Sequence, residues 1–198
     1  MSVLTYKYRI KDSTSRKHLS KMAGAIHCVW NYCNAVSLLA FRREKTFLSA
    51  YDLHKLTAGT SKDWRLSADT IQQVCTAYVT RRKQLKKVKL KWCSKKRALG
   101  WIPFKAAYIK LQGDTVTYCG HRLRLWMSRP VDGVVKTGAF VQDARGRWYV
   151  AFQCDVADAV EPVGHLDLGL DLGLQHQITC SDGVQYTREN LTKTHEDA

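Results

Sequence analysis

The sequence predicts an α+β fold: a small antiparallel β-barrel of the OB-like kind, with a helical region inserted into it. Three observations predict this fold. A short alternating segment opens the chain, a long stretch with helical spacing follows, and five short alternating segments separated by turns come after Pro103. Because 45% of the residues are hydrophobic, the chain can form a packed core.

The first expected element is a strand, and the second is a long helix. Leu4–Ile10 alternates between two faces and is rich in aromatic and branched side chains, which is typical of a strand. From Ser15 to Arg43 apolar residues recur at helical spacing. This pattern predicts an amphipathic helix that begins between Asp12 and Ser15 and carries Trp30 on its apolar stripe.

Two further helices are expected before the strands begin. One covers Ala50–Thr57 and is followed by the breaker 58–61, and the next runs from Ser67 to Lys91, with Ser67 as its cap. The last helix has apolar residues at helical spacing and a basic block along the rest of its length. We therefore expect one face to pack on its neighbours and the other to face phosphate.

The remaining strands are expected in an antiparallel sheet or small barrel that also includes the first strand. Glycine-containing turns separate them, and they cover Tyr108–Leu111, Thr115–Tyr118, Leu123–Trp126, Val134–Val141 and Trp148–Cys154. The helices are then an insertion between the first and second strands of the barrel. This gives a barrel from residues 1–11 and 108–162, a helical region at 12–107 and a separate final segment at 163–198.

The charge of the chain indicates a polyanionic partner. Lys and Arg number 32 against 17 Asp and Glu, a formal net charge of +15, and the excess lies before residue 143. An anionic membrane surface is the competing partner, but no apolar run approaches the roughly 18 residues of a spanning helix. No secretory signal is recognisable at the amino terminus, so we expect a cytoplasmic protein that binds nucleic acid.

One block of the chain concentrates this charge. Between Thr70 and Gly113 there are 12 basic residues and no acidic one. A solvated helix face is the alternative, but such faces usually mix both signs. Trp92, Trp101 and other rings are interleaved with the basic residues, which suits either base stacking or core packing. The candidate nucleic-acid-binding residues of the block are Arg81, Arg82, Lys83, Lys86, Lys87, Lys89, Lys91, Lys95, Lys96, Arg97 and Lys105.

The seven cysteines do not predict a zinc site or a disulfide framework. Their number is odd, and no two of them form a C-x-x-C pair. We expect them to be reduced and mostly buried, and we expect no zinc site in this chain. A Cys-His site built from His27, Cys28 and Cys33 is a less favoured alternative.

An aspartate near the carboxyl end is the candidate for metal chemistry. Asp171, like Asp167, lies in an apolar stretch, where burial of a carboxylate requires a compensating partner such as a divalent metal ion. Asp167 would share its face of a strand, but about 13 Å away at about 3.3 Å per residue, too far to bridge the same metal pair. Asp182, between Ser181 and Gly183, is expected to be a turn residue.

These residues resemble a known family. The segment Gly169–Leu174, followed by Ser181-Asp182-Gly183, resembles the first RuvC motif of TnpB/OrfB transposon nucleases and their type V CRISPR relatives, and its spacing selects Asp171. Motifs upstream resemble the family in order and spacing, so that the resemblance covers essentially the whole chain. They are Tyr6-Lys7-Tyr8-Arg9, Val29-Trp30-Asn31, Ser128-Arg129-Pro130 and Gly146–Val150 with Phe152.

The resemblance implies an RNA-guided DNA endonuclease that accompanies a transposase. It implies a wedge barrel, a helical recognition lobe at 12–107, and an RNase-H-like RuvC domain that begins at 163–198. Guide RNA and DNA are then the partners, Tyr6, Lys7 and Arg9 join the candidate binding residues, and Asp171 is the catalytic Mg²⁺ ligand.

The sequence departs from the family's pattern at its end. It stops at Ala198, without the later glutamate and aspartate motifs or the zinc ribbon between them. We therefore expect a truncated protein that needs the missing RuvC half, or another copy, before Mg²⁺-dependent cleavage is possible. Two alternatives stay open: a non-catalytic RNA- or DNA-binding regulator, and a decayed reading frame.

Overall fold

The computed structural model describes residues 2–11, 13–94, 98–157, 168–173 and 176–186. The chain divides into two units, one that ends at Asp158 and one that begins at Ala159. Among the described helices, none combines the length and the apolar character needed to cross a membrane.

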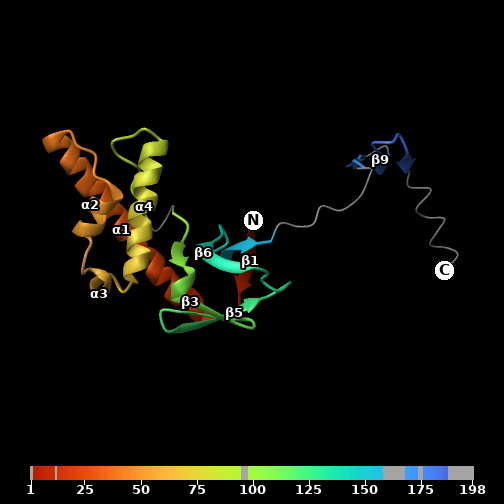
Figure 1. The fold of residues 1–198 in the computed structure, drawn as a ribbon, viewed down its shortest axis with the longest axis horizontal. Coiled ribbons are helices and arrows are strands. Elements are labelled where there is room, and N and C mark those ends of the chain that lie inside the picture. Colours follow the sequence, from red (N-terminus) through yellow and green to blue (C-terminus); the bar gives the residue numbers. More distant parts are fainter. Residues whose placement is uncertain (1, 12, 95–97, 158–167, 174–175, 187–198) are drawn as a thin grey trace. The chain divides into compact units, whose positions relative to one another are not determined.

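In the first unit, the described residues form four α-helices and seven strands, many of which Figure 1 labels. The α-helices are α1 (Ser13–Glu44), α2 (Ala50–Leu56), α3 (Ser61–Trp64) and α4 (Ala68–Gln84), and a 3₁₀ turn, η1, covers Ala106–Tyr108. The strands are β1 (Ser2–Ile10), β2 (Trp101–Lys105), β3 (Ile109–Gln112), β4 (Thr115–Tyr118), β5 (His121–Trp126), β6 (Val134–Gln142) and β7 (Trp148–Val156). The strands expected after Pro103 are all present.

The seven strands form one antiparallel sheet that is nearly closed into a barrel. Its order is β2-β6-β7-β1-β5-β4-β3, so the two outermost strands, β2 and β3, follow each other in the chain with only η1 between them. Inside, Phe104 of β2 lies 6.0 Å from Tyr118 of β4 and 5.0 Å from Phe140 of β6, measured between ring centres. A side chain at Gly138 would collide with the Phe104 ring, which explains why glycine stands there. The α+β fold with a barrel-like sheet is therefore confirmed.

The first strand lies in the middle of this sheet, as expected. β1 pairs with β7 from Ser2↔Val156 to Arg9↔Tyr149, and with β5 at Arg9↔Trp126 and Ile10↔Leu125. All four α-helices follow β1 in the chain and precede β2. The helices are thus an insertion between the first and second strands of the barrel.

One strand falls inside the range that we assigned to the helical region. β2 pairs with β6 from Trp101↔Val141 to Lys105↔Thr137. Its three central residues are all buried, and Ile102 and Phe104 have 0% exposure. Proline is tolerated here because β2 is an edge strand. One side of its backbone makes no hydrogen bonds to a neighbouring strand of the sheet.

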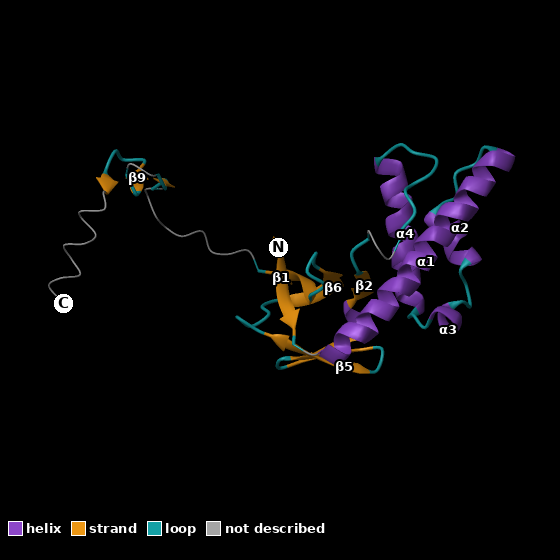
Figure 2. Cartoon of the chain, turned by 180° about the vertical axis from the view of Figure 1, so that it is seen from behind, coloured by secondary structure: helices purple, strands orange, loops and turns teal. Residues whose placement is uncertain are grey.

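The helices gather at one side of the sheet, and Figures 1 and 2 show α1, α2 and α4 packed beside one another. Val29 and Cys33 of α1, and Val74 and Tyr78 of α4, are completely buried. The Trp30 ring meets Tyr78 edge-on, with 5.3 Å between ring centres and 84° between planes. The apolar stripe predicted for α1 is therefore part of the core.

The third predicted helix begins where expected but ends early. Ser67 caps α4 by accepting a hydrogen bond from the backbone N–H of Thr70. The helix stops at Gln84 instead of Lys91, and Lys86 has a left-handed φ of 50°. The prediction of one continuous basic helix is wrong, because the backbone beyond Leu85 bonds to side chains of α1 instead.

The second unit is small, and of its described strands β8 and β10 are exposed while β9 is partly buried. β8 (Leu170–Asp171), β9 (Ile178–Cys180) and β10 (Gln185–Tyr186) form an antiparallel sheet in the order β10-β9-β8. The expectation of a buried aspartate is wrong here: Asp171 is exposed, and its neighbour Leu170 is 62% exposed. Asp182 accepts a hydrogen bond from the backbone N–H of Val184, which confirms it as a turn residue.

The cysteines are mostly buried, as expected. Cys33, Cys75, Cys154 and Cys180 are buried, and the others are partly or fully exposed. The sulfurs of Cys33 and Cys75 lie 3.7 Å apart in the core between α1 and α4.

Candidate nucleic-acid interface

Two asparagines of α1 hold the chain segment that follows α4. The Asn34 side-chain amide donates to the Leu90 carbonyl at 2.8 Å, and its oxygen accepts from the Leu90 N–H at 3.0 Å. Asn31 makes the same pair of bonds with the backbone of Cys93, both within 2.9 Å. Each amide therefore satisfies both polar groups of one residue, as a neighbouring strand would.

This clamp determines where the basic side chains of the segment 85–94 lie. Leu90 is buried at 5% exposure, whereas Lys89 and Lys91 on either side of it are exposed. Residues 87–91 thus follow the alternation of an extended chain and not that of a helix. The alternation directs Lys87, Lys89 and Lys91 away from the core.

The segment and the helices form a groove with a volume of about 890 Å³, which we call the cationic groove. Four basic and two aromatic side chains line it, and no acidic residue does. Its lining is Trp30, Arg81, Leu85, Lys87, Lys89, Leu90, Lys91, Trp92, Cys93, Ser94 and Ala98. A second hollow of about 600 Å³ shares Arg81 with it and follows α4 past Thr80 and Thr76 toward Lys105.

The cations of the groove have no carboxylate partners in the described part of the chain. The ion pairs found there involve other lysines and arginines, and Arg81 has only a 3.4 Å hydrogen bond to Gln84. Lys89 lies over the Trp92 ring, 5.3 Å from its centre, and the Trp92 side chain is 49% exposed. An exposed ring and unpaired cations are thus combined in one groove.

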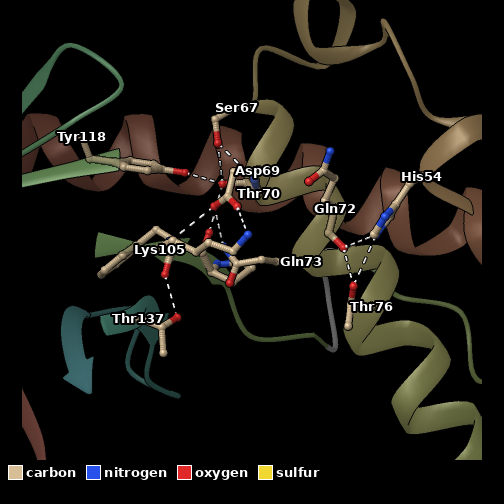
Figure 3. A network of polar contacts seen from close by, with 12 residues as sticks. His54, Ser67, Asp69, Thr70, Gln72, Gln73, Thr76, Lys105, Tyr118 and Thr137 are labelled. Carbon is tan, nitrogen blue, oxygen red and sulfur yellow. Dashed lines mark hydrogen bonds and ion pairs between the residues drawn. The ribbon is translucent and has the colours of Figure 1, made fainter. Parts of the chain in front are cut away.

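A polar network fixes the first turns of α4 to the barrel, beside the second hollow (Figure 3). The Asp69 carboxylate is buried and accepts from the Gln73 amide at 2.6 Å, and it pairs with Lys105 Nζ at 3.0 Å. The Thr70 hydroxyl donates to the Pro103 carbonyl at 3.0 Å and lies 2.6 Å from the Tyr118 hydroxyl. Burial raises the pKa of Tyr118 to about 12, so this phenol stays protonated and bonded over a wide pH range.

Several of the proposed binding residues have other partners. Arg82 is buried, donates to the Leu48 carbonyl at 2.6 Å and stacks 5.0 Å from the centre of the Phe47 ring, so it supports the helices instead of facing solvent. Tyr6 is only 4% exposed, within the sheet. Lys105 is paired with Asp69, which neutralises part of its charge. In this fold Arg82 and the Tyr6 ring are therefore buried and do not form part of the cationic surface.

The other candidates are distributed over the first unit. Lys83 and Lys86 are exposed but do not line the groove. Lys7 and Arg9 are exposed on β1, and Lys7 lies over the Tyr149 ring at 4.6 Å from its centre. Lys95, Lys96 and Arg97 lie outside the described residues.

Of the aromatic residues in the basic block, some pack in the core and others lie in the hollows where a base could stack. Phe104 belongs to the barrel core, whereas Trp92 lines the cationic groove and Trp101 lines the second hollow. Tyr108 is 52% exposed in η1.

The described residues do not assemble a metal site. No group of three or more His, Cys, Asp or Glu side chains comes together among them. Asp171 therefore lacks, within the described chain, the further carboxylates that two-metal phosphodiester chemistry requires. The described residues alone therefore do not fit a bound Mg²⁺ pair.

The sequence analysis missed the two asparagines that build the groove. Asn34 has 0% exposure and occurs between core residues of α1, so it needed a buried hydrogen-bond partner. Asn31 and Asn34 are three residues apart on one helix, as Leu90 and Cys93 are on the segment that they bind. That spacing, next to core residues of an amphipathic helix, is the signal that could have revealed them.

Comparisons with known proteins yield structural likenesses but no sequence relative. No protein-family model and no curated protein sequence matches the chain. A solved structure, the cryo-EM structure of the Cas12f1-sgRNA-target DNA complex, matches over 100% of this chain and 60% of the other, with a TM-score of 0.45 and 12% identity. The chain thus spans less than two thirds of that protein, and similarity at this level does not define a family or a function.

Proposed function

We propose that this protein binds RNA or DNA in the cationic groove, with backbone phosphates on the lysines and Arg81 and with a base stacked on Trp92. The observation that carries the proposal is the lining of the groove: Arg81, Lys87, Lys89 and Lys91 stand together without an acidic residue. A polyanion that bridges these cations would relieve their mutual repulsion and release the counterions that it carries.

The tryptophan favours nucleic acid over other polyanions. Base stacking on an exposed ring is worth about 1–3 kcal/mol per base and tolerates any base. An acidic protein segment would use the cations but would leave the flat face of Trp92 with little to stack on. Phosphate contacts fix register without reading sequence, so we expect little base preference from this groove alone.

A finer proposal follows from the sequence motifs. The resemblance to TnpB/OrfB nucleases supports a guide RNA and a DNA target as the two strands held by the barrel and helices. Trp30 and Asn31 belong to one of the resembling motifs, and in the structure Trp30 lines the groove while Asn31 holds its wall. The motif therefore coincides with the part of the fold that shapes the groove.

DNA cleavage is a separate proposal, and the described residues favour binding without it. Asp171 is exposed, and among the described residues it does not belong to a group of three or more His, Cys, Asp or Glu side chains. If a complete site is assembled with a second RuvC part or another copy, Asp171 would be its first carboxylate. Mg²⁺-dependent cutting that Asp171→Asn abolishes would support this role, and cutting that survives the substitution would exclude it.

Fluorescence anisotropy with labelled single-stranded RNA and DNA tests the binding proposal. In the variant Arg81→Gln/Lys87→Gln/Lys89→Gln/Lys91→Gln, affinity at 50 mM salt should fall about 10²-fold. The slope of log affinity against log salt should become shallower by roughly 3, from four contacts at about 0.7 each.

A charge-matched control distinguishes the groove from net charge. The variant Lys62→Gln/Arg124→Gln/Lys136→Gln/Arg145→Gln removes the same number of charges from exposed positions outside the groove. It should change affinity less than about threefold. Equal losses in the two variants would show that the protein binds through its overall charge, and the groove would then have no special role.

A further inference from the structure

A second cationic site lies where α1 meets the barrel, away from the groove. Two hollows of about 320 and 590 Å³ share His18, Lys21 and His121. The first is lined in addition by Ser15, Lys17, Arg122 and Leu123, and the second by Met22, Trp64, Arg65 and Cys119. None of these lining residues is acidic. Two are histidines, and four others are lysines or arginines.

The fold brings the two histidines into contact. His18 belongs to α1, and His121 is the first residue of β5, immediately after the tight turn at Cys119 and Gly120. Both turn residues have positive φ, 46° and 77°, which suits the two-residue hairpin between β4 and β5. The turn places the His121 ring 3.4 Å from the His18 ring, centre to centre, with 35° between the planes. Figure 2 shows the start of α1 beside β5.

One ring nitrogen of the pair lacks a hydrogen-bond partner among the described residues. Nε2 of His18 is buried and makes no hydrogen bond within the described structure. Lys17, Lys21 and Arg122 surround the two rings with positive charge. An anion with several oxygens would supply the missing acceptor to His18 and offset this charge at once.

We propose that the His18–His121 pair binds a tetrahedral oxyanion, the phosphate of a nucleic-acid strand, and takes up a proton when it does so. The assignment of the phosphate to a nucleic-acid strand rests on the proposed function. The existence of an oxyanion site is independent of it. A free phosphate or sulfate ion has the same chemistry, and the experiment below distinguishes the two sources.

The proton uptake follows from the surroundings of the rings. Burial, with His121 and Lys21 nearby, lowers the pKa of His18, so this ring is neutral near pH 7 in the free protein. The groups that face it are Lys17 and Lys21 from α1, Arg65 after α3, Cys119 from the turn, and His121 and Arg122 from β5. A bound anion places negative charge next to the ring and therefore raises the pKa of His18. Anion affinity should therefore fall by up to about tenfold per pH unit as the pH rises above the pKa of the free ring.

Titration of the histidine ring protons by NMR from pH 5 to 8 tests the site in the whole protein. Sulfate is the free oxyanion, and a short thymidine oligonucleotide is the diester; the charge of both probes is constant over this range. With either probe, the pKa of His18 should rise by about one unit. His121→Gln should remove most of this rise, whereas the control His54→Gln, on α2, should not affect it.

The outcomes assign the ligand. A response to oligonucleotide at concentrations where sulfate has no effect supports a backbone phosphate, and a response to sulfate alone supports a free anion. The four-glutamine groove variant should keep the sulfate response, which separates this site from the proposed groove function. No shift of the His18 pKa with sulfate or with oligonucleotide, in a wild-type protein that is folded by its NMR spectrum, would overturn the proposal.

Discussion

The cationic groove and the barrel surface carry the same kinds of residue with different neighbours. On the barrel, Lys11 pairs with Asp114 at 3.2 Å and Lys136 with Asp155 at 3.4 Å. The hydrogen bond from Lys11 also lowers the pKa of Asp114, so this pair keeps its charges to mildly acidic pH. In the groove, Lys87, Lys89 and Lys91 have no such partner among the described residues. Basic side chains indicate a binding surface only where acids are absent.

Two tryptophans make the same contrast. Trp92 in the groove has Lys89 over its ring at 5.3 Å, and Trp126 on β5 has Lys11 over its ring at 5.0 Å. Both rings are about half exposed or more, at 49% and 62%. The lysine above Trp126 is already paired with Asp114, whereas the lysine above Trp92 is not.

The largest change in stability is expected from a substitution that removes the support of the groove. Asn34→Ala leaves the buried N–H and carbonyl of Leu90 without partners and should lower the free energy of unfolding by about 2–4 kcal/mol. Urea denaturation measures this loss. Asn31→Ala, at a less buried position, should lower the free energy of unfolding by about 1 kcal/mol. Asn34→Ala should also weaken nucleic-acid binding without removing a cation, and unchanged affinity in a folded protein would contradict the role of the clamp.

The contact between the hydroxyls of Thr70 on α4 and Tyr118 on the barrel should be lost at alkaline pH. The folded pKa of Tyr118 is raised from about 10 to about 12, so the folded state holds this proton more tightly than the unfolded chain does. The resulting stability is fully present below pH 10 and is lost as pH rises from 10 to 12, about 2–3 kcal/mol in total. Comparison of Tyr118→Phe with the wild type in urea from pH 9 to 11 measures it. An identical alkaline decline in both proteins would contradict this assignment.

The tryptophan contrast predicts the next effect. Trp92→Ala should weaken single-strand binding by about 1–3 kcal/mol without changing the salt slope, because stacking releases no counterions. Trp126→Ala should leave affinity within about twofold of the wild type. Anisotropy titrations at several salt concentrations measure both variants. If Trp126→Ala is the more damaging substitution, nucleic acid binds the barrel instead.

Two adjacent arginines give the smallest expected difference in binding. Arg81→Gln should reduce the salt slope by about 0.7 with little change in stability, because the side chain is exposed. Arg82→Gln should leave the slope unchanged and lower the free energy of unfolding, since it removes the bond to the Leu48 carbonyl. Opposite results for the pair would mean that Arg82 reaches the ligand and Arg81 does not.

The sequence predicted the elements better than the site. Period-two alternation located the strands after Pro103, and Ser67 identified the start of α4, because these signals are local. The end of α4 was missed because Asn34, more than fifty positions away, decides it. Arg82 was misplaced for the same reason: only the fold brings Phe47 and Leu48 to its guanidinium.

Chemical labelling of lysines tests the central claim most directly. Reductive methylation followed by mass spectrometry compares each lysine with and without a single-stranded oligonucleotide. We predict that Lys87, Lys89 and Lys91 lose reactivity when the oligonucleotide is bound, while Lys11 and Lys136 on the barrel react as before. Protection of the barrel lysines with continued labelling of the three groove lysines would contradict the account.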